Sequence, residues 1–275
     1  MTLLVGLVSV LEDVSLARMA FNVTSVEGFE VLVEIAEELQ IPCILQISER
    51  YLNDLGRSFV RDMVLPRLDR STTRFVLHLD HAESLEGIVA GIKMGFTSVM
   101  YDGSRLDMAT NIRNTRDVLR IARLASVSVE AEIGHVGGAE DGENGTLSVM
   151  TTPEEAETFV AEVSVDALAV AGGNAHGHYM RPPKLHLGRI REIHQRISVP
   201  LVLHGGTGIP MDDLLAAVQV GVKKINIGTE LKHAWIVGAK EGMERSHELD
   251  VIRSSIKASI RRAILQFRPV MEGKM

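Results

Sequence analysis

Apolar runs of strand length alternate with longer stretches of helical spacing along most of the chain, and the alternation occurs eight times. The apolar runs are nearly continuous, which is typical of parallel strands that are buried on both faces. The expected strands cover residues 16–23, 42–48, 74–80, 97–102, 127–134, 166–173, 200–206 and 223–230. The expected helices that follow them cover residues 25–40, 55–68, 84–95, 106–126, 153–164, 187–197, 210–221 and 231–245.

Eight consecutive strand–helix pairs predict a closed (β/α)8 TIM barrel rather than an open sheet. A further helix over residues 251–267 is expected beyond the eighth pair. No stretch has the composition of a linker or a low-complexity segment. The sequence therefore predicts that residues 1–275 form a single (β/α)8 barrel domain with an extra C-terminal helix.

Composition removes several classes of function. The formal net charge of −7 and the aromatic content of 4% argue against a nucleic-acid binder, which needs a basic face or stacking platforms. The only cysteine, Cys43, lies in an apolar run and is expected to be a buried hydrophobe, in keeping with a reducing cytoplasm. The apolar run at 2–11 is short and is followed by acids, so neither a signal peptide nor a membrane span is expected.

Polar residues stand where the predicted strands end, which is the face that carries the active site in barrels of this kind. Histidine occurs there on three strands, as His81, His176 and His204. Imidazole is a good zinc ligand, and three protein ligands with one open position describe a catalytic zinc site. The alternative is that these histidines are hydrogen-bonded pocket residues. His78 shares a strand face with Asp80, and we expect it to be a buried supporting residue rather than a ligand.

Glycine adjoins polar groups at the ends of the last three strands. The stretches are His176-Gly177, Gly205-Gly206-Thr207-Gly208 and Asn226-Ile227-Gly228-Thr229. Barrels often bind phosphate with the loops after strands seven and eight, because glycine lets backbone N–H groups approach the oxygens. Tight turns use the same residues, so a phosphate site is one of two interpretations.

Carboxylates complete the candidate chemistry. Asp80 adjoins a possible ligand and is placed to move a proton to or from a substrate oxygen. Glu130 and Glu132 share one strand face, and Asp102 ends the neighbouring strand. The long glycine-rich and acidic loop that follows residue 134 is either an active-site lid or a solvated surface loop.

Taken together, these motifs resemble the zinc-dependent class II ketose-bisphosphate aldolases. The resemblance runs from about Ala20 to Glu230 and rests on AFNV, LHLDHAES, SVMYDGS, SVEAEIGHVGGAEDG, AHGHY, PLVLHGGTG and KINIGTEL, in order and at family-like spacing. Members of that family are (β/α)8 barrels that cleave fructose or tagatose 1,6-bisphosphate into dihydroxyacetone phosphate and glyceraldehyde 3-phosphate.

The resemblance implies a role for each matching position. Zinc would be held by His81, His176 and His204. Asp80 matches the acid/base residue at the C4 oxygen, and Glu140 matches the mobile-loop acid that handles the C3 proton. Asp102 and Glu132 match a site for a second divalent cation, and a monovalent cation (Na⁺ or K⁺) is bound near Gly177 and Gly205 in some members. The substrate pocket would comprise Asn22, Ser48, Gly177, Gly205, Gly206, Thr207, Asn226, Gly228 and Thr229.

The chain departs from the family pattern at the aldehyde end of the site. Arg50 and Tyr51 stand where small residues are usual after the second strand, and Met180 replaces a usual lysine. We therefore expect an aldolase of a small phosphosugar that takes glyceraldehyde 3-phosphate or another aldehyde as acceptor, and by analogy a homodimer or homotetramer. Two alternatives remain open, namely a non-catalytic barrel subunit that acts as a scaffold and a metal-dependent phosphosugar epimerase.

Overall fold

The strands form a closed parallel barrel in which each strand pairs with the next along the chain and the eighth pairs with the first. The computed structural model describes residues 3–12, 16–135, 149–174 and 184–273. The strands are β1 (Arg18–Asn22), β2 (Cys43–Ser48), β3 (Phe75–Ala82), β4 (Ser98–Tyr101), β5 (Ser128–Ile133), β6 (Ala167–Val170), β7 (Leu201–Leu203) and β8 (Val222–Ile227). The predicted (β/α)8 TIM barrel is confirmed.

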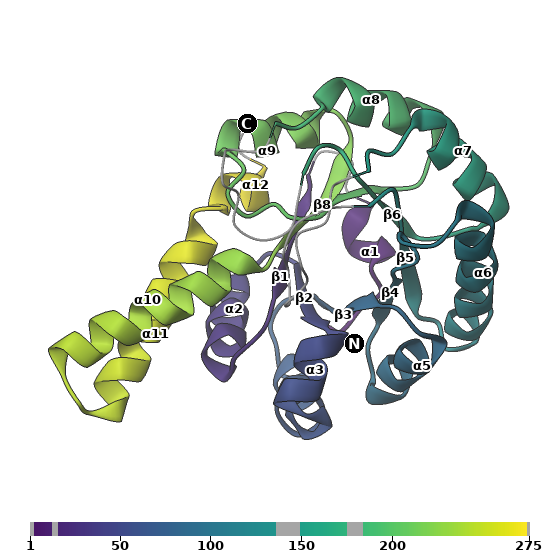
Figure 1. Ribbon diagram of the computed structural model, residues 1–275. Helices are drawn as coiled ribbons and strands as arrows, with labels where there is room; N and C mark the ends of the chain where they lie inside the picture. Colours follow the sequence, from purple (N-terminus) through teal and green to yellow (C-terminus); the bar gives the residue numbers. More distant parts are fainter. Residues whose placement is uncertain (1–2, 13–15, 136–148, 175–183, 274–275) are drawn as a thin grey trace.

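Helices surround the barrel except for α1, which lies inside the ring of strands, as Figure 1 shows. They are α1 (Val8–Leu11), α2 (Val26–Leu39), α3 (Glu49–Leu55), the π-helix η1 (Phe59–Val64), α4 (Leu65–Asp69), α5 (Leu85–Met94), α6 (Met108–Leu124), α7 (Pro153–Glu162), α8 (Leu187–Arg196), α9 (Met211–Gln219), α10 (Thr229–Arg245), α11 (Leu249–Leu265) and α12 (Arg268–Glu272). The helix α7 begins with a capping box between Thr152 and Glu155 and has a proline in its first turn, which ends the connection from β5 at a defined residue.

One predicted helix differs from the structure. The spacing predicts a single helix over residues 55–68, whereas the chain forms α3 directly after β2, breaks, and resumes as η1 and α4. The break falls at Gly56, whose φ of 80° lies in the left-handed region that ends helices. The helix α3 begins directly at the C-terminal end of β2, where Ser48 is its N-cap.

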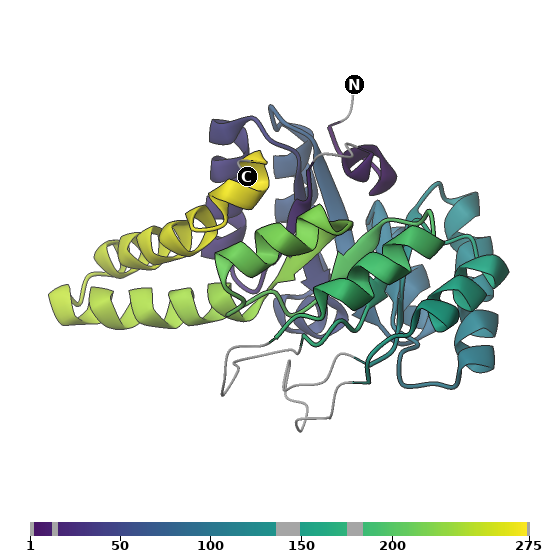
Figure 2. The same cartoon turned by 90° about the horizontal axis from the view of Figure 1, so that it is seen from above.

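The interior of the barrel is closed at its N-terminal end by the first segment of the chain. Leu7, Val10 and Leu11 are buried against small and branched side chains that point inward from the strands. The Leu7 amide donates to Ser128 Oγ at 3.0 Å, and Leu4 forms a parallel bridge with Phe75. Figure 1 shows α1 inside the ring of strands, and Figure 2 shows it at one end of the barrel. The site therefore has only one open face, at the C-terminal ends of the strands.

A hairpin of two long helices, α10 and α11, projects from the side of the barrel (Figures 1 and 2). The two helices approach closely at Gly238 and Gly242 of α10. A Cβ atom at Gly238 would lie 2.6 Å from the Ile256 Cα atom of α11. Small residues at this contact allow the two backbones to meet.

Candidate active site

Strand β3 delivers two consecutive side chains, Asp80 and His81, to the open face. Side chains alternate along a regular strand, so neighbours would face opposite sides. The register between β3 and β4 shifts between Leu79 and Ala82, and His81 has a φ of 48°. This irregularity turns His81 back toward the barrel axis. A left-handed conformation is uncommon in residues other than glycine, and such strain concentrates at functional sites.

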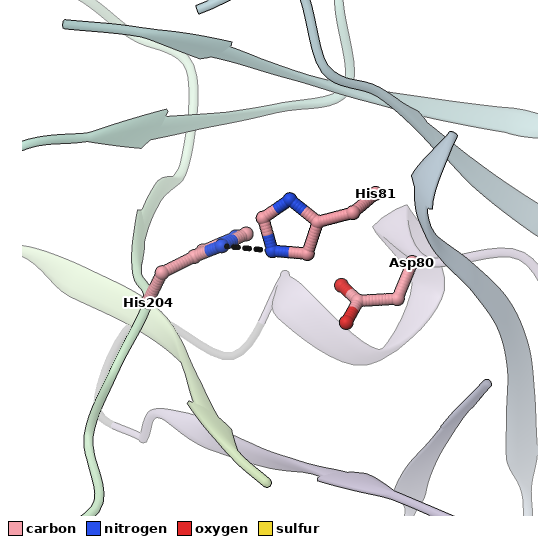
Figure 3. Close-up of side chains that lie close together, drawn as sticks. All are labelled: Asp80, His81 and His204. Atoms are coloured by element: carbon pink, nitrogen blue, oxygen red, sulfur yellow. Dashed lines mark hydrogen bonds between the residues drawn. The ribbon is translucent and has the colours of Figure 1, made fainter. Parts of the chain in front are cut away.

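The rings of His81 and His204 meet over the axis of the barrel. His81 Nε2 lies 3.1 Å from His204 Nδ1, and the ring planes cross at 87° (Figure 3). Two imidazole nitrogens bound to one tetrahedral zinc ion lie about 3.3 Å apart, since each Zn–N bond is about 2.0–2.1 Å. The two nitrogens are therefore spaced as zinc ligands are. The third expected ligand, His176, lies outside the described residues.

Carboxylates hold the far nitrogen of each ring. Asp102 Oδ2 is 2.8 Å from His81 Nδ1, and Glu130 Oε1 is 2.9 Å from His204 Nε2. Hydrogen bonds of this kind fix the tautomer of a metal-binding histidine and direct the other nitrogen toward the ion. Burial works against a charge on His81, but Asp80 and Asp102 outweigh it and raise the pKa of His81 well above its usual value. When no metal is bound, the charged ring of His81 therefore donates from Nε2 to His204 Nδ1.

Asp80 lies beside this pair and is 3% exposed (Figure 3). Its Oδ2 accepts from Asn22 Nδ2 at 2.7 Å and from Gln46 Nε2 at 3.4 Å, and its Oδ1 accepts from Asn226 Nδ2 at 3.4 Å. Burial favours the neutral acid, but the positive charges of His81 and Lys224 prevail and lower the pKa of Asp80. The group is an oriented carboxylate that accepts protons. Asp80, His81 and His204 also form one of the sets of ligand atoms within 4.8 Å of one another.

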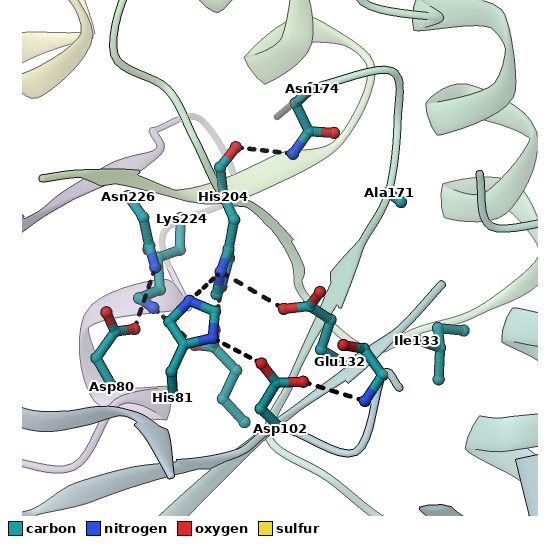
Figure 4. A network of polar contacts seen from close by, with 12 residues as sticks. Asp80, His81, Asp102, Glu132, Ile133, Ala171, Asn174, His204, Lys224 and Asn226 are labelled. Atoms are coloured by element: carbon teal, nitrogen blue, oxygen red, sulfur yellow. Dashed lines mark hydrogen bonds and ion pairs between the residues drawn. The ribbon is translucent and has the colours of Figure 1, made fainter. Parts of the chain in front are cut away.

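A second set of converging ligand atoms comprises His81, Asp102 and Glu132. His204 Nδ1 is 3.6 Å from Glu132 Oε2, so the two sets adjoin (Figure 4). Burial of Asp102 is outweighed by its hydrogen bond with His81, and the pKa of Asp102 falls below its usual value. The expected second divalent cation thus has two carboxylates and one imidazole within reach.

Further charged residues lie below this layer, inside the barrel, and one of them, Lys224, was missed by the sequence analysis. Lys224 Nζ is 2.8 Å from Glu130 Oε2, and both side chains are fully buried. Burial opposes a charge on Glu130, but the attraction of Lys224 and the hydrogen bond with His204 hold its pKa below its usual value. His78 is also fully buried, as expected, with Nδ1 2.8 Å from Ser98 Oγ. Burial, followed by the charge of Lys224, lowers the pKa of His78 to about 3, so this ring is neutral.

The loops after β7 and β8 contact each other. Gly206 N donates to Asn226 O at 3.0 Å, and Glu230 N donates to Thr207 Oγ1 at 3.3 Å. Gly205 has a φ of 61°, and a Cβ at Gly206 would lie 2.7 Å from Ile225 Cγ2. Glycine is therefore favoured at Gly205 by the backbone conformation and at Gly206 by close packing. Gly228 and Thr229 stand at the N-terminus of α10, and the N-terminal end of a helix dipole favours an anion.

The aldehyde end of the expected site is lined by residues from two helices. Ser48 pairs with Asp80 in the register of β2 and β3, and its Oγ accepts from Tyr51 N. Lys232 Nζ, from the first turn of α10, lies 5.1 Å from the centre of the Tyr51 ring. The sequence analysis noted Tyr51 but missed Lys232. The expected Gly177 and Glu140 lie outside the described residues.

A closed barrel with imidazoles and carboxylates at the C-terminal ends of its strands has the architecture of a TIM-barrel enzyme. Residues 6–271 match the family model for class-II fructose-bisphosphate aldolase. The chain belongs to the class II fructose-bisphosphate aldolase family. It is a lyase of the aldolase type.

Curated relatives carry two different aldolase names. The chain is 39% identical over 226 residues to "Fructose-bisphosphate aldolase" of Geobacillus stearothermophilus, which covers 80% of this chain and 78% of the relative. It is 39% identical over 220 residues to "6-phospho-5-dehydro-2-deoxy-D-gluconate aldolase" of Halalkalibacterium halodurans, which covers 78% of this chain and 75% of the relative.

Solved structures share the fold over nearly the whole chain. The YdjI aldolase from Escherichia coli K12 matches with a TM-score of 0.87 at 28% identity, covering 98% of both chains. Fructose-bisphosphate aldolase from Campylobacter jejuni matches with a TM-score of 0.80 at 20% identity, covering 97% of this chain and 93% of that one, and it supports the fold alone. Among the described residues, no helix has the length and apolar character needed to cross a membrane.

Proposed function

We propose that the protein is a zinc-dependent aldolase that reversibly cleaves a ketose phosphate and releases dihydroxyacetone phosphate. The observation that carries the proposal is the convergence of His81 Nε2 and His204 Nδ1, 3.1 Å apart, beside the oriented carboxylate of Asp80. His176 is assigned as the third ligand on the family motif. When bound, zinc supplies Lewis-acid polarisation of the substrate ketone.

Asp80 is assigned the proton at the C4 oxygen. Three side-chain amides, those of Asn22, Gln46 and Asn226, direct their N–H groups at its carboxylate and hold it in one orientation. A fixed carboxylate with a lowered pKa accepts the hydroxyl proton as the C3–C4 bond breaks and returns it in the condensation direction. Glu140 is assigned the C3 proton on the family motif alone.

The donor half of the substrate is assigned to the glycine-rich loops of β7 and β8. Both relatives' names describe a phosphate ester on the carbon next to a ketone, as in dihydroxyacetone phosphate. Gly205, Gly206, Thr207, Gly228 and Thr229 surround the N-terminus of α10 and fit such a phosphate. A monovalent cation near Gly177 and Gly205, and a second divalent cation at Asp102 and Glu132, belong to the same proposal.

The acceptor is assigned as glyceraldehyde 3-phosphate or another aldehyde. Tyr51 and Lys232 together narrow the aldehyde end and place one cation there. On α11, Arg253 pairs with Glu27 and Arg261 pairs with Glu38 of α2, so both of these cations already have acidic partners.

We further propose a homodimer or homotetramer in the cytoplasm. Four large apolar side chains are exposed on α10 and at the start of α11, namely Trp235, Ile236, Met243 and Leu249. Several exposed apolar side chains on one projecting hairpin are typical of a surface that another copy covers.

The test is condensation of dihydroxyacetone phosphate with a panel of neutral, acidic and phosphorylated aldehydes. We expect about one zinc per chain at the catalytic site, product from at least one aldehyde, and loss of activity in EDTA that zinc restores. Full activity after complete metal removal would rule out this mechanism. No condensation with any aldehyde by a zinc-loaded protein would favour the scaffold or the epimerase instead.

A further inference from the structure

A buried ion pair links β5 and β8 across the barrel interior. Lys224 Nζ and Glu130 Oε2 are 2.8 Å apart, and neither side chain has any exposed surface. Lysine is among the residues least often buried, and an apolar pair of similar size is often at least as stabilising as a buried ion pair. Stability is therefore a weak reason for this pair to be there, and its surroundings suggest another.

The second oxygen of Glu130 contacts a candidate zinc ligand. Glu130 Oε1 accepts from His204 Nε2 at 2.9 Å, so the ring proton resides on Nε2. The lone pair on Nδ1 then points toward His81 Nε2, where the proposed zinc would bind. The Asn174 amide also donates to the His204 carbonyl oxygen at 2.8 Å, which fixes the backbone while Glu130 fixes the ring.

Within the described part of the chain, Glu130 lies outside the groups of atoms that could hold a metal ion. Asp102, the corresponding partner of His81, does belong to one of them. The carboxylate of Glu130 therefore contacts His204 through Oε1 and Lys224 through Oε2.

Lys224 supplies the only full positive charge in contact with Glu130 among the described residues. The neighbouring His78 is neutral, and its Nε2 is 3.8 Å from Glu130 Oε2, beyond hydrogen-bond distance. Without Lys224, Glu130 would be a buried carboxylate without a counterion, which is strongly unfavourable.

We propose that Glu130 and Lys224 act as a positioning pair that fixes the tautomer and orientation of His204 for zinc. This inference rests on the proposed zinc aldolase function. Partners of this kind typically change metal affinity about 10- to 100-fold when they are removed.

The decisive variant replaces both members of the pair, as Glu130→Leu with Lys224→Met. It removes two buried charges together, so we expect it to fold with a melting temperature close to that of the parent in EDTA. We expect its zinc dissociation constant, measured by chelator competition, to rise about 10- to 100-fold. The single variant Glu130→Gln should weaken zinc binding as well, since its amide cannot satisfy His204 and Lys224 equally.

Ser128→Ala is the matched control. Ser128 lies on the same strand and face as Glu130 and is hydrogen-bonded to Leu7, but it is two residues farther from His204. We expect a lower melting temperature and an unchanged zinc dissociation constant. A double variant that folds and binds zinc as tightly as the parent would overturn the positioning role.

A measurement without metal separates this inference from the zinc proposal. In the metal-free parent, imidazole ¹⁵N shifts should show His204 protonated at Nε2, and in the double variant both tautomers should be populated. If the parent fails to bind zinc but shows this difference, the zinc function is wrong and the positioning pair stands. The same tautomer in both proteins would overturn the pair.

Discussion

At the scale of single residues, the amides around Asp80 are the feature with the clearest consequence. Asn22, Gln46 and Asn226 all point N–H groups at its carboxylate. An amide in place of the acid would turn its own N–H group toward these donors and could accept fewer hydrogen bonds. We expect Asp80→Asn to fold and to keep zinc, while turnover falls by about 10²- to 10⁴-fold. Steady-state cleavage and zinc content measure the two effects. Undiminished turnover would remove Asp80 from its assigned role.

The proton that His81 donates toward His204 makes zinc binding depend on pH. Because the pKa of His81 is raised above 6.5 in the metal-free protein, zinc must displace this proton across the neutral range. Zinc affinity should therefore rise about tenfold per pH unit until the pH passes the pKa of His81.

In the metal-free protein, the charged ring of His81 adds stability that is fully present below pH 6.5 and is lost as the pH rises through its pKa.

Chelator competition and thermal unfolding in EDTA, both between pH 6 and 9, test these two trends. A zinc affinity that does not change over this range would contradict the raised pKa of His81. His247, an exposed histidine between α10 and α11, provides a control through His247→Gln, which should leave both profiles unchanged.

The polar residues at the C-terminal ends of the strands were the part of the candidate site that the sequence could predict. Polar residues at the C-terminal ends of apolar runs are visible by position alone, and Asn22, Asp80 and Asn226 are indeed adjacent. Gln46 and Lys224 were missed because they lie inside the strands. Each stands two residues before a strand-end polar residue, so strand alternation could have indicated that they face the same interior.

At the scale of elements, the contact between α10 and α11 depends on glycine. We expect Gly238→Ala to destabilise the protein by about 1–2 kcal/mol, since its Cβ would meet the backbone of Ile256 and overpacking outweighs the gain in helix propensity. Gly188 of α8 has no atom near its Cβ position, so Gly188→Ala should stabilise the protein by about 0.5–1 kcal/mol.

Urea unfolding of the two variants beside the parent measures both changes. Equal shifts of the same sign would show that the close contact between the two helices does not control stability. A destabilised Gly188→Ala variant would equally contradict the open space around that residue.

Two elements escaped the sequence analysis for physical reasons. The helix α3 is only seven residues long, too short for helical spacing to be visible, and Gly56 separates it from the next helical stretch. The irregularity at His81 arises from the pairing of β3 with β4, which no local pattern encodes. Propensity describes one segment at a time, and both features depend on a neighbour.

At the scale of the whole molecule, the barrel itself was predictable. Its strands are buried on both faces and each is followed by an amphipathic helix, so the eightfold repeat is visible in the pattern of apolar residues. The role of residues 7–11 was not predictable, because the sequence analysis had only excluded a signal peptide and a membrane span there. What these apolar residues cover becomes clear only when all eight strands are in place.

The exposed apolar side chains of the helical hairpin predict the behaviour of the protein in solution. Ile236 and Met243 are seven residues apart on α10 and therefore share a face. Replacing both with glutamate should weaken self-association at least tenfold, as measured by light scattering over a range of concentrations. Leu124→Glu changes an even more exposed apolar residue on α6 and should leave the mass unchanged. A monomeric parent, or equal masses for all three proteins, would contradict the proposed homo-oligomer.

The segment that closes the N-terminal end of the barrel affects how the chain folds during synthesis. Leu7, Val10 and Leu11 leave the ribosome before any strand, yet their packing partners extend as far as Val202 of β7. These apolar side chains therefore remain exposed to solvent for most of translation. Contacts between residues so distant in sequence also form slowly. A nascent chain arrested before β7 would expose both this segment and the unfinished strands beside it. Newly made protein should consequently depend on chaperones until the last strands emerge.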